Sequence, residues 1–449
     1  MASLIDHTSV PSGKSELDVF SVPTTQVAVK NGFWCEVNPQ NTLTNSGPYE
    51  FHIPSDPHFL DLAKNYIFMQ IRIVKNNGNA LTWDPAAQDQ AAAAAHIEDK
   101  VGPIQLLGKT FFKQIKLYLG SKLAYDSGDT YAYRSYIETE LNFNESYKMS
   151  FLQAAGYQAD YPAEHLDAAT NEGWTKRCKW FKDSNVVEFM APLHVDLFHQ
   201  EKYLINQIDV RLELHRNPEA FSLMSYAANA RFRFRVEDMK WIVRKVDPAE
   251  SVSLALETTL LRTTVKYPVR RVQIKTLQVE ANRQDTPSTT LFNGQIPRRI
   301  VVCCVDSDAF HGTYTKSPFN FKHYSATSIQ VTAGGVNFPP NPLLMDYGRK
   351  LFMRPFVQMY EALGHVNTHR SCWVDVDDYS HGNAFYVFDL SPDSSDDAHW
   401  ELIKEGATTI RMTFSQAIPA GGIKLIVLAE FDNLITVDRF RNIYFDYTP

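Results

Sequence analysis

The stretch of sequence that decides the fold is Ile115-Lys-Leu-Tyr-Leu-Gly-Ser-Lys-Leu-Ala-Tyr125. Its pattern returns later in the chain as Ile329-Gln-Val-Thr-Ala-Gly-Gly-Val-Asn-Phe-Pro339, which sets Gly120 against Gly334. A helical pattern follows each copy. Self-similarity of this kind within one chain indicates a structural unit that occurs twice.

Three further pairs of segments match in the same order along the two halves. They join residues 187–190 to 385–388, 208–212 to 410–414, and 236–239 to 428–431. Alternating strands also align with one another by chance, and that alternative stays open. A duplicated sandwich divided near Asp247-Pro248 is the better interpretation, because a proline that starts a helix after an Asp cap would mark a new element.

Strand patterns dominate the rest of the chain. Apolar and polar residues alternate with period two in residues 66–74, 111–119, 208–214 and 231–236, so each segment should bury one face. Helical periodicity is confined to about 129–141, 248–261 and 343–363, the last with a kink expected at Pro355. The sequence therefore predicts an all-β chain with a few short helices.

Length and composition agree with two large sandwiches. The 449 residues are too many for one compact core, and 12% of them are aromatic. Gly, Pro, Asn, Asp and Ser recur at short intervals, as turns between many strands require. The net charge of −7, with both signs interspersed, argues against a surface dedicated to coating phosphate backbones. We expect no sequence-specific binding of nucleic acid.

The cysteines and the N-terminus indicate a protein made in the cell interior. Five cysteines are scattered along the chain, an odd number, and Cys303 and Cys304 are adjacent, so reduced thiols are expected. The start of the chain lacks a basic region followed by an apolar stretch and lacks the glycine needed for myristoylation. The longest apolar run near the end, 423–429, is too short to cross a bilayer. We expect synthesis in the cytoplasm or nucleus without secretion through a signal peptide.

Two segments are expected to be surface insertions. Residues 76–108 contain the alanine run 91–95, which could be loop or short helix, and residues 142–184 carry few strand signals. Loops of such length are usually functional or disordered. The first should project from the common scaffold, where insertions are tolerated.

Three framework segments resemble a known family. They are Leu4-Ile-Asp-His-Thr-Ser-Val-Pro-Ser-Gly-Lys-Ser-Glu-Leu-Asp-Val-Phe-Ser-Val-Pro23, Gly108-Lys-Thr-Phe-Phe-Lys-Gln-Ile-Lys-Leu-Tyr-Leu-Gly120 and Phe292-Asn-Gly-Gln-Ile-Pro-Arg-Arg-Ile-Val301. They look like the major capsid protein of Maverick (Polinton) elements and adintoviruses. The resemblance covers most of the chain in order, least well in the two expected insertions, and includes no catalytic signature.

The resemblance implies a double jelly-roll hexon. Behind an N-terminal arm (1–22) it implies two tandem eight-stranded jelly rolls, 23–247 and 248–449, and a homotrimer that forms a pseudo-hexagonal capsomer of an icosahedral double-stranded DNA virus or virus-like element. Neighbouring capsomers and vertex (penton) or minor capsid proteins would be its partners in the virion, and whether a membrane lies beneath the shell stays open. Three subunits of two sandwiches offer six similar units around a closed threefold axis.

Enzyme-like motifs are weak, and we expect no catalytic, cofactor-binding or metal-binding residues. Gly102 to Thr110 resembles a phosphate-binding loop, but a strand pattern follows where a helix is required. His194 with His199, and His365 with His369, are interpreted as exposed loop histidines and not as zinc ligands. No Gly-x-Ser-x-Gly elbow occurs.

Cysteine, acidic and basic clusters have ordinary structural explanations. Cys303 and Cys304 follow an apolar run and are expected in the core. The acidic runs 375–378 and 393–397 lack the pattern of a calcium loop, although a lattice-stabilising cation is conceivable. Residues 231–235 alternate Arg and Phe, as a half-buried strand does, although single-stranded nucleic acid could also stack there.

Two other functions stay open. One is a carbohydrate-binding or glycoside-hydrolysing β-sandwich, because paired carboxylates from distant strands leave no local motif. The other is a minor or vertex capsid protein.

The arm has little periodicity and is expected to order only against a neighbour or the inner face of a shell.

Overall fold

The computed structural model describes residues 8–10, 12–83, 99–227, 230–394 and 399–447. The first half of the chain forms two antiparallel sheets of four strands. One has the order β1-β10-β3-β7 and the other β2-β8-β5-β6. Their bounds are β1 (Val29–Val37), β2 (Tyr49–Ile53), β3 (Phe59–Lys75), β5 (Phe112–Leu119), β6 (Lys122–Asp126), β7 (Val187–Ala191), β8 (Val210–Arg216) and β10 (Phe232–Pro248).

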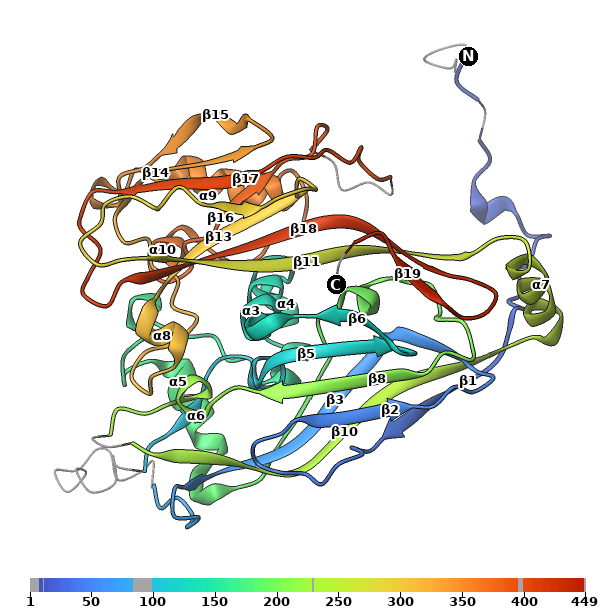
Figure 1. The fold of residues 1–449 in the computed structure, drawn as a ribbon, viewed down its shortest axis with the longest axis horizontal. Coiled ribbons are helices and arrows are strands. Elements are labelled where there is room, and N and C mark those ends of the chain that lie inside the picture. The colour runs from blue at the N-terminus through green and yellow to red at the C-terminus, as the bar shows by residue number, and fades with distance from the viewer. Residues whose placement is uncertain (1–7, 11, 84–98, 228–229, 395–398, 448–449) are drawn as a thin grey trace.

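The second half repeats this arrangement strand for strand. Its sheets have the orders β11-β18-β13-β16 and β12-β17-β14-β15, and β19 adds to β18. The bounds are β11 (Val265–Val279), β12 (Thr290–Phe292), β13 (Arg299–Asp306), β14 (Ala326–Ala333), β15 (Val336–Leu344), β16 (Tyr386–Asp389), β17 (Thr408–Phe414), β18 (Ile423–Val437) and β19 (Ile443–Phe445). Each half is thus an eight-stranded jelly roll, and the expected all-β fold with two tandem jelly rolls is confirmed (Figure 1).

The hairpin of residues 115–125 has an equivalent in the second half. β5 turns into β6 at Gly120 (φ 58°), and β14 turns into β15 at Gly334 (φ 57°). A two-residue turn between antiparallel strands needs positive φ, which glycine adopts without a Cβ clash. The other matched segments also lie on equivalent strands: β7 pairs with β3 as β16 pairs with β13, and β8 pairs with β5 as β17 pairs with β14. The repeat is therefore structural.

Short helices fill the connections. They are α2 (Leu107–Thr110), α3 (Tyr131–Asn142), α4 (Glu145–Lys148), α5 (Glu172–Trp180), α6 (Glu219–Ser222), α7 (Glu250–Leu260), α8 (Ser307–His311), α9 (Met353–Ala362) and α10 (Val376–Ser380). A two-residue strand pair, β4 (Gly102–Pro103) with β9 (Leu223–Met224), completes the first half. None of the helices in the described part of the chain is long and apolar enough to cross a membrane.

Two predicted helices begin later than expected. Pro248 is the last residue of β10 and lies opposite Val29, so the strand ladder and not an Asp cap occupies this point, and α7 begins after Ala249. Of the pattern over 343–363, only residues 353–362 form α9, while the first two residues end β15 and η8 (Tyr347–Arg349) lies between them. Pro355 lies in the first turn of α9, where its missing N–H has no intrahelical partner, and the expected kink is wrong.

The described parts of both expected surface insertions contribute to the core. Leu81 and Trp83 are buried, as are Ile104, Leu106 and Leu107, and only 84–98, with the alanine run, lies outside the described residues. Trp174, Cys178 and Phe181 are likewise buried in the second segment, where α5 packs against β4. Both expectations are wrong for these buried residues, because sparse strand periodicity does not exclude a large apolar side chain that packs from a short helix or an irregular segment.

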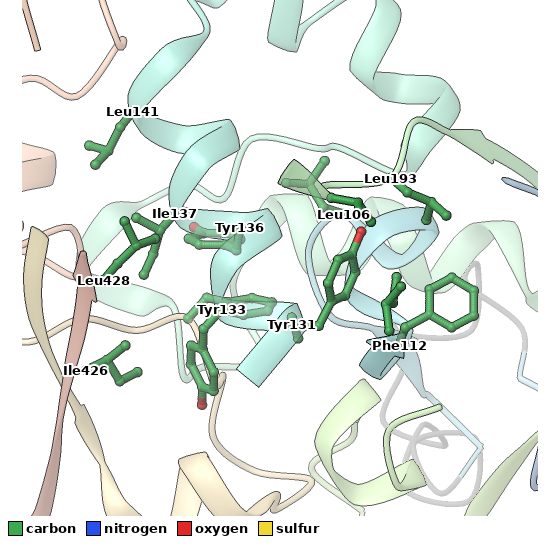
Figure 2. Packing of buried hydrophobic residues seen from close by; sticks show 14 of the residues in the cluster. Leu106, Phe112, Tyr131, Tyr133, Tyr136, Ile137, Leu141, Leu193, Ile426 and Leu428 are labelled. Carbon is green, nitrogen blue, oxygen red and sulfur yellow. The ribbon is translucent and has the colours of Figure 1, made fainter. Parts of the chain in front are cut away.

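Helix α3 lies between the two jelly rolls and joins their cores (Figure 1). Figure 2 shows Ile137 of α3 beside Ile426 and Leu428 of β18, while Tyr131 points toward Leu106 of the first half. The Tyr136 ring also stacks on Phe319, with 4.1 Å between the ring centroids. Burial of apolar area on both sides of one helix couples the two sandwiches.

Candidate functional site

A buried ionic network includes charged side chains of α3. The Arg134 guanidinium contacts Oε1 of Glu138 at 2.8 Å and Oδ1 of Asp196 at 2.7 Å. Asp196 also accepts a hydrogen bond from the Val272 N–H in β11, at 3.2 Å. Because Asp196 belongs to the first half and Val272 to the second, one charged pair links the two jelly rolls through a backbone N–H.

The network continues from Glu138 to His194 and Lys109. Nδ1 of His194 lies 2.5 Å from Oε2 of Glu138, and Nε2 of His194 lies 3.0 Å from Nζ of Lys109. An ionised carboxylate only accepts hydrogen bonds, so Nδ1 carries the proton and Nε2 accepts from Lys109. Lys109 also donates to Oγ1 of Thr139 at 3.0 Å. Lys109, Glu138 and His194 lie on three separate segments, and only the tertiary fold brings them together.

A cavity of about 560 Å³ opens beside this network. Glu138, His194 and His199 line it from the first half, and Val272, Arg299, Glu430 and other residues line it from β11, β13 and β18 of the second. The rings of His194 and His199 lie edge to face, with 5.3 Å between their centroids. The site is therefore a polar chamber between the two sandwiches.

Burial and charge set the ionisation of the network. Burial would raise the pKa of Glu138, but the Arg134 charge and the hydrogen bond from His194 hold it well below its usual range. Burial lowers the pKa of Lys109 to about 7, and burial with the Lys109 charge lowers the pKa of His194 to about 3. His199 is exposed by accessible surface, but its partial desolvation at the cavity also lowers its pKa. At neutral pH both imidazoles are thus uncharged.

The expectation that His194 and His199 are exposed loop histidines is wrong for His194, which is buried, and is confirmed for His199, which is exposed. The potential ligand atoms of Glu138, His194 and His199 all lie within 4.8 Å of one another. No spacing motif reveals this grouping, because Glu138 lies on α3, more than fifty residues before the histidines in the sequence. His365, by contrast, contacts the Leu141 carbonyl at 3.3 Å, and His369 is exposed.

The segment that resembles a phosphate-binding loop is part of the core. A Cβ atom on Gly102 would lie 2.6 Å from Sγ of Cys178, so this glycine allows close packing against α5. Lys109 is buried and bonded to Thr139 and His194. The expected strand follows as β5, after the four residues of α2. These contacts leave the Lys109 ammonium unavailable to a phosphate.

The remaining motifs lie in structural positions. Cys303 and Cys304 are buried in β13, as predicted, and burial raises the pKa of Cys304 to about 12. Phe232 and Phe234 point inward from β10, as expected for a half-buried strand. All five cysteines are free thiols.

The acidic runs and the arm also have clear positions. Asp375 caps α10 by accepting the Asp378 N–H at 2.8 Å. In the second run Asp393 meets His399 at 3.0 Å, and 395–397 lie outside the described residues. The described part of the arm extends away from both jelly rolls (Figure 1), and Phe20 is 97% exposed.

Comparison with solved structures identifies proteins of the same fold. A chain of the Sputnik virophage, seen by electron cryomicroscopy, superposes with a TM-score of 0.63 at 11% identity, over 99% of this chain and 94% of the other. The mavirus major capsid protein gives 0.56 at 10% identity, over 100% and 98%. The Faustovirus major capsid protein gives 0.56 at 7% identity, over 93% and 92%. The whole chain thus shares the double jelly-roll fold of these viral proteins.

Sequence comparison finds a relative without an assigned function. An uncharacterized protein of Caenorhabditis elegans is 29% identical over 427 residues, which cover 94% of this chain and 98% of the relative. No family model matches the chain.

Proposed function

We propose that this chain is a major capsid protein whose homotrimer forms a pseudo-hexagonal capsomer in the icosahedral shell of a double-stranded DNA virus or virus-like element. The observation that carries the proposal is the strand-for-strand equivalence of the two halves. A closed trimer of such subunits presents six similar sandwiches and can tile a nearly hexagonal lattice with one gene product. The capsid proteins of mavirus and Faustovirus, which have this fold, support it.

The proposed division is an arm (1–22), a first jelly roll (23–247) and a second jelly roll (248–449). The two jelly rolls are not loosely tethered. Besides α3, two hydrogen bonds connect them. Nζ of Lys148 donates to the Cys372 carbonyl at 2.9 Å, and Nζ of Lys122 donates to the Ile443 carbonyl at 2.7 Å. A rigid pair of sandwiches is what a repeating shell subunit requires, because each must keep a fixed orientation to its neighbours.

Exposed apolar side chains supply surfaces for assembly. Val19, Phe20 and Val22 of the arm are exposed, and so are Leu254 and Leu261 at α7. Apolar side chains gathered on a soluble protein's surface mark contacts with other chains. We assign these surfaces to contacts within the trimer, between capsomers, or with vertex and minor capsid proteins of the virion. The chain would be made in the host cell interior before assembly.

Native mass spectrometry of the full chain tests the proposal. The expected species has three times the mass of one 51.2 kDa chain. Negative-stain images should show particles of pseudo-hexagonal outline. Val19→Ser with Phe20→Ser tests the assignment of the arm, because neither side chain is part of either core, and a loss of assembly by this variant would place the arm at a contact between chains.

Other outcomes would contradict the proposal. A stable monomer at micromolar concentration that binds or cleaves glycans would favour the carbohydrate-active alternative. A pentamer, or binding only to a separate hexon, would favour a vertex or minor capsid protein.

A further inference from the structure

We propose that Glu138, His194 and His199 bind one divalent transition-metal ion, of which Zn²⁺ is the best match, in the cavity between the two jelly rolls. The proposal goes beyond capsid assembly and does not depend on it. Two imidazoles and one carboxylate are a common protein ligand set for Zn²⁺, with water in the fourth position.

The geometry brings the three ligands to one point. Their potential ligand atoms lie within 4.8 Å of one another, and all three side chains line the same cavity. Ligands at about 2.0–2.2 Å from a tetrahedral zinc ion are separated by about 3.3–3.6 Å. Only small side-chain rotations are therefore needed, and the space of about 560 Å³ leaves room for water on the open side.

His199 is the most telling member of the cluster. Its ring makes no hydrogen bond to any other residue in the described part of the chain, although it sits beside a carboxylate and a second imidazole. His199 is exposed, so an ion can reach its ring without breaking a hydrogen bond to the protein. His199 ends η7 (Asp196–His199), whose first residue is tied to Arg134, so its backbone is held in place.

The other two ligands are oriented by neighbours, as metal ligands commonly are. Arg134 holds Oε1 of Glu138 at 2.8 Å and leaves Oε2 facing His194. Lys109 lies 3.0 Å from Nε2 of His194, on the side away from Glu138. These contacts fix both side chains before any cation arrives.

Metal binding exchanges protons for the cation. The ion takes the place of the proton between Nδ1 of His194 and Oε2 of Glu138, and that proton goes to solvent. Nε2 of His194 then takes one proton from the Lys109 ammonium, and the neutral Lys109 amine accepts a hydrogen bond from it. One proton leaves for each ion bound.

The test uses the full chain, stripped of metal with a chelator and dialysed. We would measure Zn²⁺ binding by equilibrium dialysis, and Co²⁺ coordination by its visible absorbance, which strengthens when the ion becomes tetrahedral. The expected result is one ion per chain and a thermal unfolding midpoint that rises with Zn²⁺ concentration.

His199→Ala is the decisive variant, because it removes a ligand and no hydrogen bond. It should weaken Zn²⁺ binding by more than about 100-fold, a larger effect than the loss of an outer-shell contact. His399→Ala is the matched control, because His399 lines the same cavity but belongs, with Asp393 and Glu401, to a second and more exposed group of potential ligands. Its Zn²⁺ affinity should equal that of the parent chain.

Any of three results would overturn the proposal. The parent chain could bind no stoichiometric metal, His199→Ala could bind as well as the parent, or His399→Ala alone could abolish binding. Should His199→Ala fail to fold, His199→Gln keeps the size and polarity of the side chain, and the same affinities apply to it.

Discussion

Replacement of Trp83 by alanine tests whether the segment after β3 belongs to the core. Trp83 is 1% exposed, and the Lys100 ammonium lies 5.8 Å from its ring centroid. The neighbouring backbone is also anchored, because the Leu81 N–H donates to Oγ of Ser184 at 2.8 Å. A buried Trp→Ala substitution removes contacts and leaves a cavity, and typically costs about 3–5 kcal/mol.

The indole N–H of Trp83 reduces the expected loss of stability. Its indole N–H has no hydrogen-bond acceptor among the described residues, so its burial carries a penalty of about 1 kcal/mol that the substitution relieves. We therefore expect Trp83→Ala to lower the free energy of unfolding by about 2–4 kcal/mol. Trp83→Phe keeps most of the ring without the N–H, and should cost less than about 1.5 kcal/mol.

Urea denaturation followed by circular dichroism measures both changes. The matched control is Trp400→Ala, since Trp400 is 51% exposed, and it should change the free energy of unfolding by less than about 0.5 kcal/mol. A loss below about 1 kcal/mol for Trp83→Ala would show that the segment is a dispensable surface loop. By the same reasoning, a deletion from Asn79 to Glu98 removes Leu81 and Trp83 and should yield unstable protein.

Three other predictions follow from buried groups. Ile137→Ala, between α3 and β18, should lower the free energy of unfolding by about 2–4 kcal/mol in urea denaturation, and a change under 1 kcal/mol would mean that the two cores are not coupled there. Burial, followed by the Asp375 charge, raises the pKa of Asp378 to about 6. Its folded-state pKa lies above the unfolded value, so the parent loses stability as pH rises from about 4 to 6. Asp378→Asn should therefore be more stable by about 1 kcal/mol at pH 7 after solvent screening, and equal below pH 4, and thermal melts across that range would contradict this if the difference did not depend on pH. Cys303→Ala with Cys304→Ala should keep the oligomeric state in native mass spectrometry, with a modest loss of stability, and dissociation would give the thiols a role in assembly.

Local patterns determined the architecture of this protein. Period-two alternation predicted strands such as β5, β8 and β10, because a strand that buries one face must alternate. The glycines at 120 and 334 marked equivalent turns, because only positive φ closes a two-residue hairpin there. Since both signals depend on neighbours in the chain, the duplicated sandwich could be predicted without coordinates.

Tertiary packing decided what local patterns could not express. Trp83 and Trp174 lie in segments without strand periodicity, so their burial depends on which element covers them. Glu138, His194 and His199 come together because α3 lies against the loop after β7, and no fixed spacing between them records that approach. The late start of α9 within 343–363 has the same cause, since the first two of these residues pair with β14 as the end of β15. Short-range alternation gives the positions of the strands along the chain, whereas the cavity between the jelly rolls exists only where distant segments meet.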